Sequence, residues 1–297
     1  MRSVFDWNTG ARTLQLGKRT LIMGVVNVTP DSFSDGGLFL DRDKAVEHAL
    51  RLLDDGADII DVGGESTRPG AQVGPGGQAG EPPKGVSEKE ELERVIPVIR
   101  QLKQKRPKTV VSVDTYKAVV ARAGVEVGAE VVNDVSAFRW DPKMAKTVAE
   151  LNCGAVLMHM RGRPEEWRKL PPSPDIVVLT KRELRDWADA AMMAGVKREK
   201  IVLDPGFGFG KNFEENYPLL RRLDEFHQLR YPLLAGISRK SFVGRMLARD
   251  GIDATVDQRL YGTLATETAA ILKGVHIIRT HDVRATADAV RVADIVA

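Results

Sequence analysis

The sequence is nearly free of cysteine: Cys153 is the only one among 297 residues. An intrachain disulfide is therefore excluded, and this agrees with a reducing compartment. We interpret Cys153 as a buried structural thiol rather than a nucleophile, because free cysteine is among the most buried residue types. Residues 1–8 lack the apolar core of a signal peptide, and no stretch approaches the ~20 apolar residues that span a bilayer. We therefore expect a cytoplasmic protein.

Charge of one sign is not in excess either. The 44 basic residues face 41 acidic ones, which leaves a formal net charge of +3. Such a balance predicts neither a nucleic-acid nor a membrane partner. The chain also lacks the HxH, HExxH and CxxC spacings of zinc sites, and no early strand-to-helix turn carries GxGxxG. A zinc site and a doubly wound open sheet are therefore disfavoured.

Short apolar runs alternate with segments of helical spacing along the chain. The runs are almost continuously hydrophobic, as expected of strands buried on both faces. They are residues 21–28, 57–62, 109–113, 130–133, 155–159, 201–203, 232–237 and 275–279. The expected helices are residues 43–55, 87–105, 117–127, 142–151, 177–194, 214–229, 257–273 and 284–295. The alternation predicts an α/β protein folded as a single-domain (β/α)8 TIM barrel, with a doubly wound open sheet as the alternative.

Two segments do not fit this repeat. Residues 1–19 form an N-terminal extension with a possible short strand at 13–17, so the barrel is expected to span 20–297. Residues from about 69 to 86 are dominated by Gly and Pro, which excludes a helix or a central strand. We interpret this stretch as a loop insertion after the second strand, and both an exposed peripheral loop and a lid remain open. Ser87 followed by Glu90 is a capping-box pattern that predicts a helix start.

Polar residues follow every one of the eight apolar runs. A barrel brings the C-terminal ends of its strands to one mouth, so these residues are expected to converge. Polar groups gathered in a partly apolar pocket cost desolvation free energy unless a ligand or each other satisfies them. The strand ends, in chain order, are NVTPDSFSDGG from Asn27, DVGGESTRPG from Asp61, SVDT from Ser112, NDVS from Asn133, MHMRG from Met158, DPG from Asp204, GISRKS from Gly236 and RTHD from Arg279. The sequence therefore predicts a ligand site at this mouth.

One chemical subset suits a flat heterocycle. Asp114, Asn133 and Asp204 supply donors and acceptors for an amidine-like edge, since a carboxylate facing two ring N–H groups forms a paired hydrogen-bond pattern. Lys240 suits either this subset or an anion, and a pocket lysine is also a candidate Schiff-base nucleophile.

A second subset suits an anion. Arg68, Arg279 and His281 would form an anion site, because guanidinium groups match phosphate oxygens. Asn27 and Asp31 are oxygen ligands that would hold Mg²⁺ together with waters and a substrate phosphate.

These motifs together resemble the dihydropteroate synthase family over nearly the whole chain. The matching segments are MGVVNVTPDSFSDGG from Met23, GADIIDVGGESTRPG from Gly56, SVDTYK from Ser112, NDVSA from Asn133, LMHMRG from Leu157, LDPGFGFGK from Leu203, GISRKSFVG from Gly236 and IIRTHDV from Ile277. The resemblance implies a pterin-binding TIM barrel that uses Mg²⁺ and forms a homodimer. It also implies a transferase of folate biosynthesis that joins 6-hydroxymethyl-7,8-dihydropterin diphosphate to 4-aminobenzoate.

The resemblance further implies a role for each site residue. The catalytic residues would be Asp114, Lys240, Arg279 and His281. The pterin would contact Asp114, Asn133, Val135, Met158, Asp204, Phe209, Lys240 and Arg279. The diphosphate would contact Asn27, Arg68, Arg279 and His281, with Asn27 also contacting the metal. Aminobenzoate would contact Phe33, Thr67, Pro69, Phe209 and Ser241. The insertion at about 69–86 departs from the family, whose members continue almost directly into the helix at Ser87.

Two other functions remain as alternatives. A corrinoid methyltransferase that uses methyltetrahydrofolate would share Asp114, Asn133 and Asp204, but it would not need the anion set. A non-catalytic pterin-binding barrel usually loses charged motif residues, and all the expected ones are present here.

Overall fold

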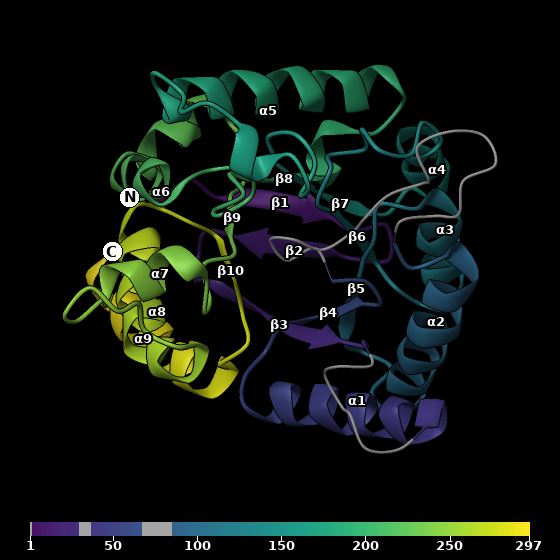
Figure 1. Cartoon of the computed structure of the whole chain (residues 1–297). Helices are drawn as coiled ribbons and strands as arrows, with labels where there is room; N and C mark the ends of the chain where they lie inside the picture. Colours follow the sequence, from purple (N-terminus) through teal and green to yellow (C-terminus); the bar gives the residue numbers. More distant parts are fainter. Residues whose placement is uncertain (1, 30–36, 67–84) are drawn as a thin grey trace.

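Eight parallel strands form the centre of the computed structural model, which describes residues 2–29, 37–66 and 85–297 (Figure 1). The strands are β3 (Leu21–Asn27), β4 (Ile59–Gly63), β5 (Val110–Asp114), β6 (Val131–Asp134), β7 (Gly154–Met158), β8 (Ile201–Asp204), β9 (Leu234–Ala235) and β10 (Ile277–Thr280). Their order is β8–β7–β6–β5–β4–β3–β10–β9. A parallel bridge between Leu203 and Leu233 joins the two ends of this sheet, so it closes into a barrel.

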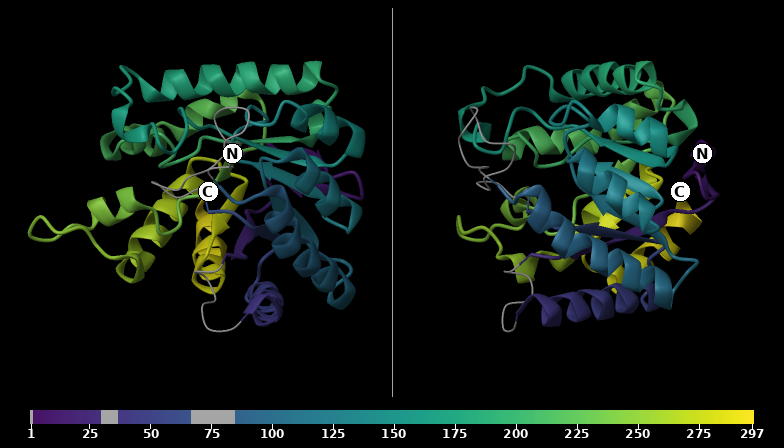
Figure 2. Two further views of the ribbon diagram at one scale, coloured as in Figure 1. Left: turned by 45° about the vertical axis from the view of Figure 1, so that its right-hand side comes forward. Right: turned by 90° about the vertical axis from the view of Figure 1, so that its right-hand side faces the viewer.

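Helices cover the outside of the barrel. They are α1 (Gly37–Asp54), α2 (Glu88–Lys105), α3 (Ala118–Glu126), α4 (Met144–Leu151), α5 (Ile176–Met193), α6 (Phe213–Arg221), α7 (Ser241–Met246), α8 (Leu260–Leu272) and α9 (Val283–Val296). Figure 2 shows α1 and α5 on opposite sides of the strands. The predicted TIM barrel is confirmed, and the doubly wound open sheet is excluded because the sheet closes.

Several predicted boundaries were wrong. The seventh strand was expected at 232–237, but its regular pairing is confined to Leu234–Ala235. The helix expected at 214–229 ends at Arg221 and continues as the 3-10 helix η4 (Leu223–Leu229), because Arg222 leaves the helical region at φ −111°. The short helix α7 was not predicted at all. The capping box at Ser87 is confirmed, with Ser87 accepting from the backbone of Glu90.

An antiparallel hairpin covers the N-terminal end of the barrel. It consists of β1 (Phe5–Asn8) and β2 (Thr13–Leu16), whereas a single strand at 13–17 had been considered. Trp7 and Leu16 are fully buried against the first residues of the barrel strands, and the Trp7 indole donates to the Lys200 carbonyl over 2.8 Å. Apolar packing therefore fills the barrel from this end, and the polar strand ends lie at the opposite one.

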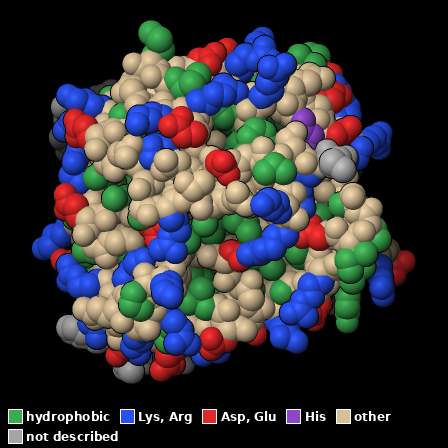
Figure 3. All heavy atoms as spheres, turned by 180° about the vertical axis from the view of Figure 1, so that it is seen from behind, with side chains coloured by type: hydrophobic (Ala, Val, Ile, Leu, Met, Phe, Trp, Pro, Cys, Tyr) green, Lys and Arg blue, Asp and Glu red, His purple; other side chains and the backbone are tan. Residues whose placement is uncertain are grey.

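The outer surface carries mixed charge. Figure 3, which views the molecule from behind Figure 1, shows Lys and Arg side chains interspersed with Asp and Glu. This face therefore presents no broad field of one sign, in agreement with the near balance of basic and acidic residues in the sequence. In the part of the chain that the structure describes, no helix combines the length and the apolar character needed to cross a membrane.

Candidate active site

A guanidinium shared by two carboxylates lies at the C-terminal end of the barrel. Arg279 on β10 donates from Nε to Asp61 Oδ2 over 2.7 Å and from Nη2 to Asp114 Oδ2 over 2.6 Å. Asn133 on β6 donates to the same Asp61 oxygen over 3.0 Å. Because β4, β5 and β6 are neighbours and β10 pairs with β3, the barrel register brings the four side chains together. Strand ends far apart in sequence thus form one hydrogen-bonded cluster.

Two carboxylates face one guanidinium in this cluster, and this excess of acidic groups shifts the pKa values of its members. Burial raises the pKa of Asp114 to about 7, and the nearby charge of Asp61 adds to the rise, while Arg279 opposes it. Burial by itself lowers the pKa of Arg279, but Asp61 and Asp114 outweigh that effect and raise it. The guanidinium therefore stays charged, and Asp114 is set to gain or lose its proton near neutral pH.

A second polar pair lies at the ends of β8 and β9. Asp204 closes β8 and is buried, and Lys240 immediately precedes α7. The Lys240 ammonium donates to the Phe207 carbonyl and lies 4.3 Å from the centre of the Phe209 ring. Burial lowers the pKa of Lys240 to about 7, although Asp204 opposes this shift. Burial likewise raises the pKa of Asp204, against the effect of Lys240. Each group thus supports the charged form of the other.

The turn after Asp204 requires glycine at two positions. Gly206 has φ +67°, and an added Cβ would lie 1.8 Å from the His159 carbonyl oxygen. Gly210 has φ +66°, and its Cβ would lie 2.2 Å from the carbonyl oxygen of Arg161. A side chain at either position would therefore meet both backbone strain and a clash. The Gly206 amide also donates to Asp204 Oδ1 over 2.7 Å, so the turn holds this carboxylate in place.

An apolar cluster stands beside the polar groups. Its buried members come from the ends of β5, β6 and β7 and from the segments that follow, namely Tyr116, Val135, Trp140, Met158 and Met160. Trp167 and Phe209 pack against it, with their rings edge to face at 5.6 Å between centres. Val135, Met158 and Phe209 were predicted to line a heterocycle, and the structure brings all three into this one cluster.

The remaining predicted residues are more dispersed. The His281 ring lies 3.1 Å from the Ser238 hydroxyl through Nδ1, which orients it by the β9–α7 segment. Asn27 is half-buried at the end of β3, in register with Gly63. Ser241 is exposed at the start of α7. Phe33, Thr67, Arg68 and Pro69 lie outside the described residues.

Asp61 was not predicted as a site residue. It had been noted only as the start of a polar strand end, yet it is fully buried inside the barrel and receives two of the hydrogen bonds described above. Its other oxygen, Oδ1, is buried without a partner among the described residues. The available signal was a carboxylate within an otherwise apolar strand, because such a residue needs a partner in the interior.

Asn27 is the one predicted metal contact that lies among the described residues. In residues 2–29, 37–66 and 85–297, no three His, Cys, Asp or Glu side chains gather as a metal cluster. Asn27 offers one amide oxygen at the end of β3. This fits Mg²⁺, which is commonly held by few protein ligands together with substrate phosphates and water.

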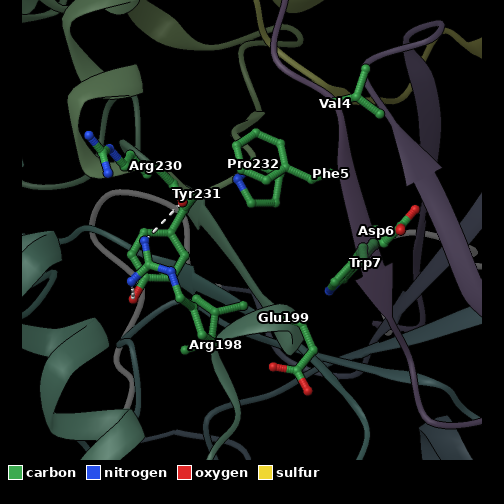
Figure 4. Close-up of a pocket in the computed structure, with 10 residues that line it drawn as sticks. Val4, Phe5, Asp6, Trp7, Arg198, Glu199, Arg230, Tyr231 and Pro232 are labelled. Atoms are coloured by element: carbon green, nitrogen blue, oxygen red, sulfur yellow. Dashed lines mark hydrogen bonds between the residues drawn. The ribbon is translucent and has the colours of Figure 1, made fainter.

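A cavity of about 340 Å³ lies elsewhere, at the N-terminal end of the barrel. Figure 4 shows that Phe5 and Tyr231 border it and that the Arg198 side chain reaches the Tyr231 hydroxyl. Arg198 also donates to the Leu229 and Arg230 carbonyls. The guanidinium is thus held by the protein itself, and the polar strand ends lie at the other end of the barrel. This cavity therefore does not belong to the candidate site.

Comparison with known proteins shows likeness across the whole chain. A family model described as pterin binding enzyme matches residues 23–281. The dihydropteroate synthase of Clostridium beijerinckii is 43% identical over 97% of this chain and 98% of its own length. That of Escherichia coli is 44% identical over 92% of this chain and 90% of its own length.

Solved structures agree with this likeness. Xanthomonas albilineans dihydropteroate synthase with 4-aminobenzoic acid matches with a TM-score of 0.87 and 41% identity, covering 99% of this chain and 98% of that one. The same organism's enzyme in complex with 7,8-dihydropteroate matches with a TM-score of 0.80 and 40% identity, covering 95% of each chain. Sequence and fold therefore lead to the same group of proteins.

Proposed function

Because the chain belongs to the dihydropteroate synthase family of pterin-binding enzymes, we propose that it joins 6-hydroxymethyl-7,8-dihydropterin diphosphate to 4-aminobenzoate. The products are 7,8-dihydropteroate and diphosphate, and the reaction serves folate biosynthesis. The observation that carries the proposal is the convergence of Asp114, Asn133, Asp204, Lys240 and Arg279 around one apolar-walled mouth, since these are the donors and acceptors that such a substrate needs. Relatives crystallised with 4-aminobenzoic acid and with 7,8-dihydropteroate support it.

The pterin occupies the buried half of the mouth. Asp114, Asn133 and Asp204 receive and donate at its amidine-like edge, where paired hydrogen bonds fix the ring. Lys240 donates to its carbonyl side. The ring packs against Val135, Met158 and Phe209, and Arg279 stacks on its face. The apolar cluster supports this arrangement, because it contains or touches all three packing residues.

The diphosphate lies toward Arg279 and His281, with Arg68 as the third cation and Asn27 as the metal contact. Asn27 would hold Mg²⁺, and the metal would supply positive charge that favours departure of the diphosphate. Aminobenzoate contacts Thr67, Pro69 and Ser241, with Phe33 and Phe209 as apolar walls. Two observations support the diphosphate assignment. Asn27 is half-buried, and the His281 ring is held in one orientation by Ser238.

The reaction proceeds by departure of the leaving group before attack. The C–O bond to the diphosphate breaks, and Arg68, Arg279 and His281 accept the negative charge that develops. The exocyclic methylene is left as a carbocation that is delocalised into the dihydropterin ring. The carboxylate of Asp114 stabilises this positive charge, and the neutral arylamine then attacks the methylene carbon. This attack needs no strong general base, because the electrophile is highly reactive, and the arylammonium product then releases its proton to water.

Three further properties complete the proposal. Residues 20–297 form one pterin-binding domain that follows an N-terminal extension, with residues of about 69–86 as an insertion. The protein works in the cytoplasm, and it forms a homodimer, for which the family resemblance is the support. Mg²⁺ is its cofactor, which the amide oxygen of Asn27 at the end of β3 supports.

The decisive experiment is to mix the purified protein with the dihydropterin diphosphate, 4-aminobenzoate and Mg²⁺. Equimolar release of diphosphate and 7,8-dihydropteroate is expected. Diphosphate retained in the presence of both substrates would contradict the proposal. Methyl transfer from methyltetrahydrofolate to a corrinoid protein would support the methyltransferase instead, and pterin binding with neither reaction would support a non-catalytic barrel.

A further inference from the structure

A buried lysine lies beside the turn that follows Asp204. Lys211 is 7% exposed and has not yet been given a role. Its Nζ donates to the Gly206 carbonyl over 2.7 Å, to the Phe209 carbonyl over 3.2 Å and to the His159 carbonyl over 3.4 Å. Only the protonated amine has three N–H donors, so three acceptors indicate an ammonium. All three are backbone carbonyls, and among the described residues no carboxylate pairs with Lys211 directly.

The contacts of this ammonium reach Asp204 from two sides. The Gly206 amide donates to Asp204 Oδ1 over 2.7 Å, while the carbonyl of the same glycine accepts from Lys211. The His159 amide donates to the Asp204 carbonyl over 2.8 Å, while the His159 carbonyl accepts from Lys211. The two residues that bond Asp204 are therefore both held by one ammonium, which joins the end of β7 to the turn after β8.

Asp204 also needs positive charge nearby. Its side chain is 4% exposed, and burial raises its pKa, while Lys240 and Lys211 both oppose the rise. Burial and the charge of Lys240 in turn lower the pKa of Lys211 well below its usual range, and Asp204 opposes this shift. Lys240 is a proposed pterin contact, whereas Lys211 bonds only the protein backbone. Lys211 therefore supplies positive charge to Asp204 whether or not a ligand is bound.

A purely structural role does not explain a charged group at this position. A neutral amide side chain or an ordered water would satisfy the same carbonyls without the cost of burying an ammonium that has no counter-ion in contact. What the ammonium adds is positive charge close to the Asp204 carboxylate, together with a fixed turn. Both features suit a carboxylate that accepts from two ring N–H groups in one orientation.

We propose that Lys211, acting through Gly206 and His159, is a positioning residue that aims the Asp204 carboxylate at the amidine-like edge of the pterin. The inference rests on the proposed function, in which Asp204 binds that edge. Lys211 itself touches no substrate, because its three donors are used by backbone carbonyls. Its effect is therefore on the recognition of the pterin edge and not on the reacting atoms.

The test compares two ligands on Lys211→Met and on the wild type. One is 6-hydroxymethylpterin, and the other is its analogue in which hydrogen replaces the amino group of the amidine-like edge. The wild type should prefer the first, because the analogue leaves a buried acceptor without its partner. In Lys211→Met this preference, measured as the ratio of the two Kd values in competition titrations, should fall about tenfold. That is the order of effect of losing one well-aligned, charge-assisted hydrogen bond.

Two further variants keep the test decisive. Lys211→Gln keeps donors for the carbonyls but removes the charge, so it should also lower the preference, and it decides the matter if Lys211→Met does not fold. Lys200→Met is the matched control. Lys200 is 2% exposed and donates to the Asn152 carbonyl over 2.6 Å at the other end of the barrel. Its variant should lose stability but keep both Kd values.

Failure of the inference is distinguishable from failure of the proposed function. An unchanged ratio of the two Kd values in Lys211→Met, or in Lys211→Gln if Lys211→Met does not fold, would overturn the positioning role. An equal loss of affinity for both ligands would also overturn it, and so would a wild type that binds both equally well. A wild type that shows the preference but forms no 7,8-dihydropteroate would instead overturn the proposed reaction alone.

Discussion

The carboxylates of Asp61 and Asp114 share one guanidinium, that of Arg279, at 2.7 Å and 2.6 Å. Two acids paired with one base leave an excess of negative charge in a mostly apolar enclosure. Such an excess is costly while the site is empty and favourable once positive charge develops beside it. The proposed carbocation supplies that charge, so the unbalanced pairing suits the reaction better than a balanced ion pair would.

Asp114→Asn tests this directly. The amide keeps nearly the same shape but loses the negative charge, so kcat should fall by about a hundredfold, which is the usual effect of removing one electrostatic group from a transition state. Steady-state kinetics with both substrates would measure it, and circular dichroism would show that the fold is kept. Turnover near the wild-type value would mean that Asp114 does not stabilise the cation.

The pH dependence of kcat/KM should reflect two site groups. Asp114 acts as the anion and has a pKa of about 7, so kcat/KM should rise with pH through that range. Lys240 acts as the cation and its pKa is lowered to about 7, so kcat/KM should decline above neutrality. The profile of kcat/KM against pH should therefore be a narrow bell. Asp114→Asn should remove the decline on the acid side, and Lys240→Met should remove the decline on the alkaline side. A flat profile from pH 6 to 8 would contradict both assignments.

Gly206 and Gly251 form a matched pair for testing the turn after Asp204. Both have positive φ, but a Cβ on Gly206 meets the His159 carbonyl at 1.8 Å, whereas nothing lies within 4 Å of one on Gly251. Gly251→Ala should therefore cost about 1 kcal/mol, from backbone strain alone. Gly206→Ala should cost more than about 3 kcal/mol, because the turn must move as well. Urea unfolding would measure the free energy of unfolding of both variants. Equal losses of stability would show that the contact between the new Cβ at position 206 and the His159 carbonyl is relieved at no cost.

Glu267 on α8 should make stability depend on pH. Burial raises its pKa to about 7 from an ordinary 4.5, although Thr286 and Thr280 hydrogen bonds oppose the rise. Between these values the unfolded chain has lost a proton that the folded protein retains, so the free energy of unfolding falls as pH rises. Glu267→Gln should remove this loss and be more stable than the wild type at pH 8.

The measurement is the urea midpoint of both proteins at pH 5 and pH 8. The control is Glu214→Gln, at an exposed position of α6, which should leave the difference between the two midpoints as it is in the wild type. If the Glu267→Gln variant keeps the wild-type difference between the urea midpoints at pH 5 and pH 8, another group causes the pH dependence.

Much of the barrel was predictable because the two sequence patterns that indicate it, apolar strands and polar strand ends, are local. Strands buried on both faces are continuous apolar runs, and their polar ends mark one mouth regardless of how the helices pack. The seventh strand was overestimated because apolar residues at 232–237 are buried without making regular pairs beyond Leu234 and Ala235. Helix α7 was not predicted because its six residues are too few to show the helical periodicity of apolar residues.

The cluster around Asp61 was not predictable by the same means. Its contacts depend on which residues of β4, β6 and β10 face inward at the same height, and that register is set by the closed sheet as a whole. The same holds for Lys117, whose ammonium donates to Glu65 and, from a separate segment, to Val86 and Glu91. Motif likeness predicted which residues contact ligands, but it gave no indication of the residues that hold those side chains in place.

The closure of the barrel has a consequence for how the chain is made. Strand β3 is hydrogen-bonded to β10, and Arg2 and Thr20 both bond Asp294 in the last helix. On the ribosome, these early residues emerge long before their partners exist. An apolar strand with an unpaired edge must therefore wait for nearly the whole chain to be translated, which is the interval in which association with other chains competes with folding.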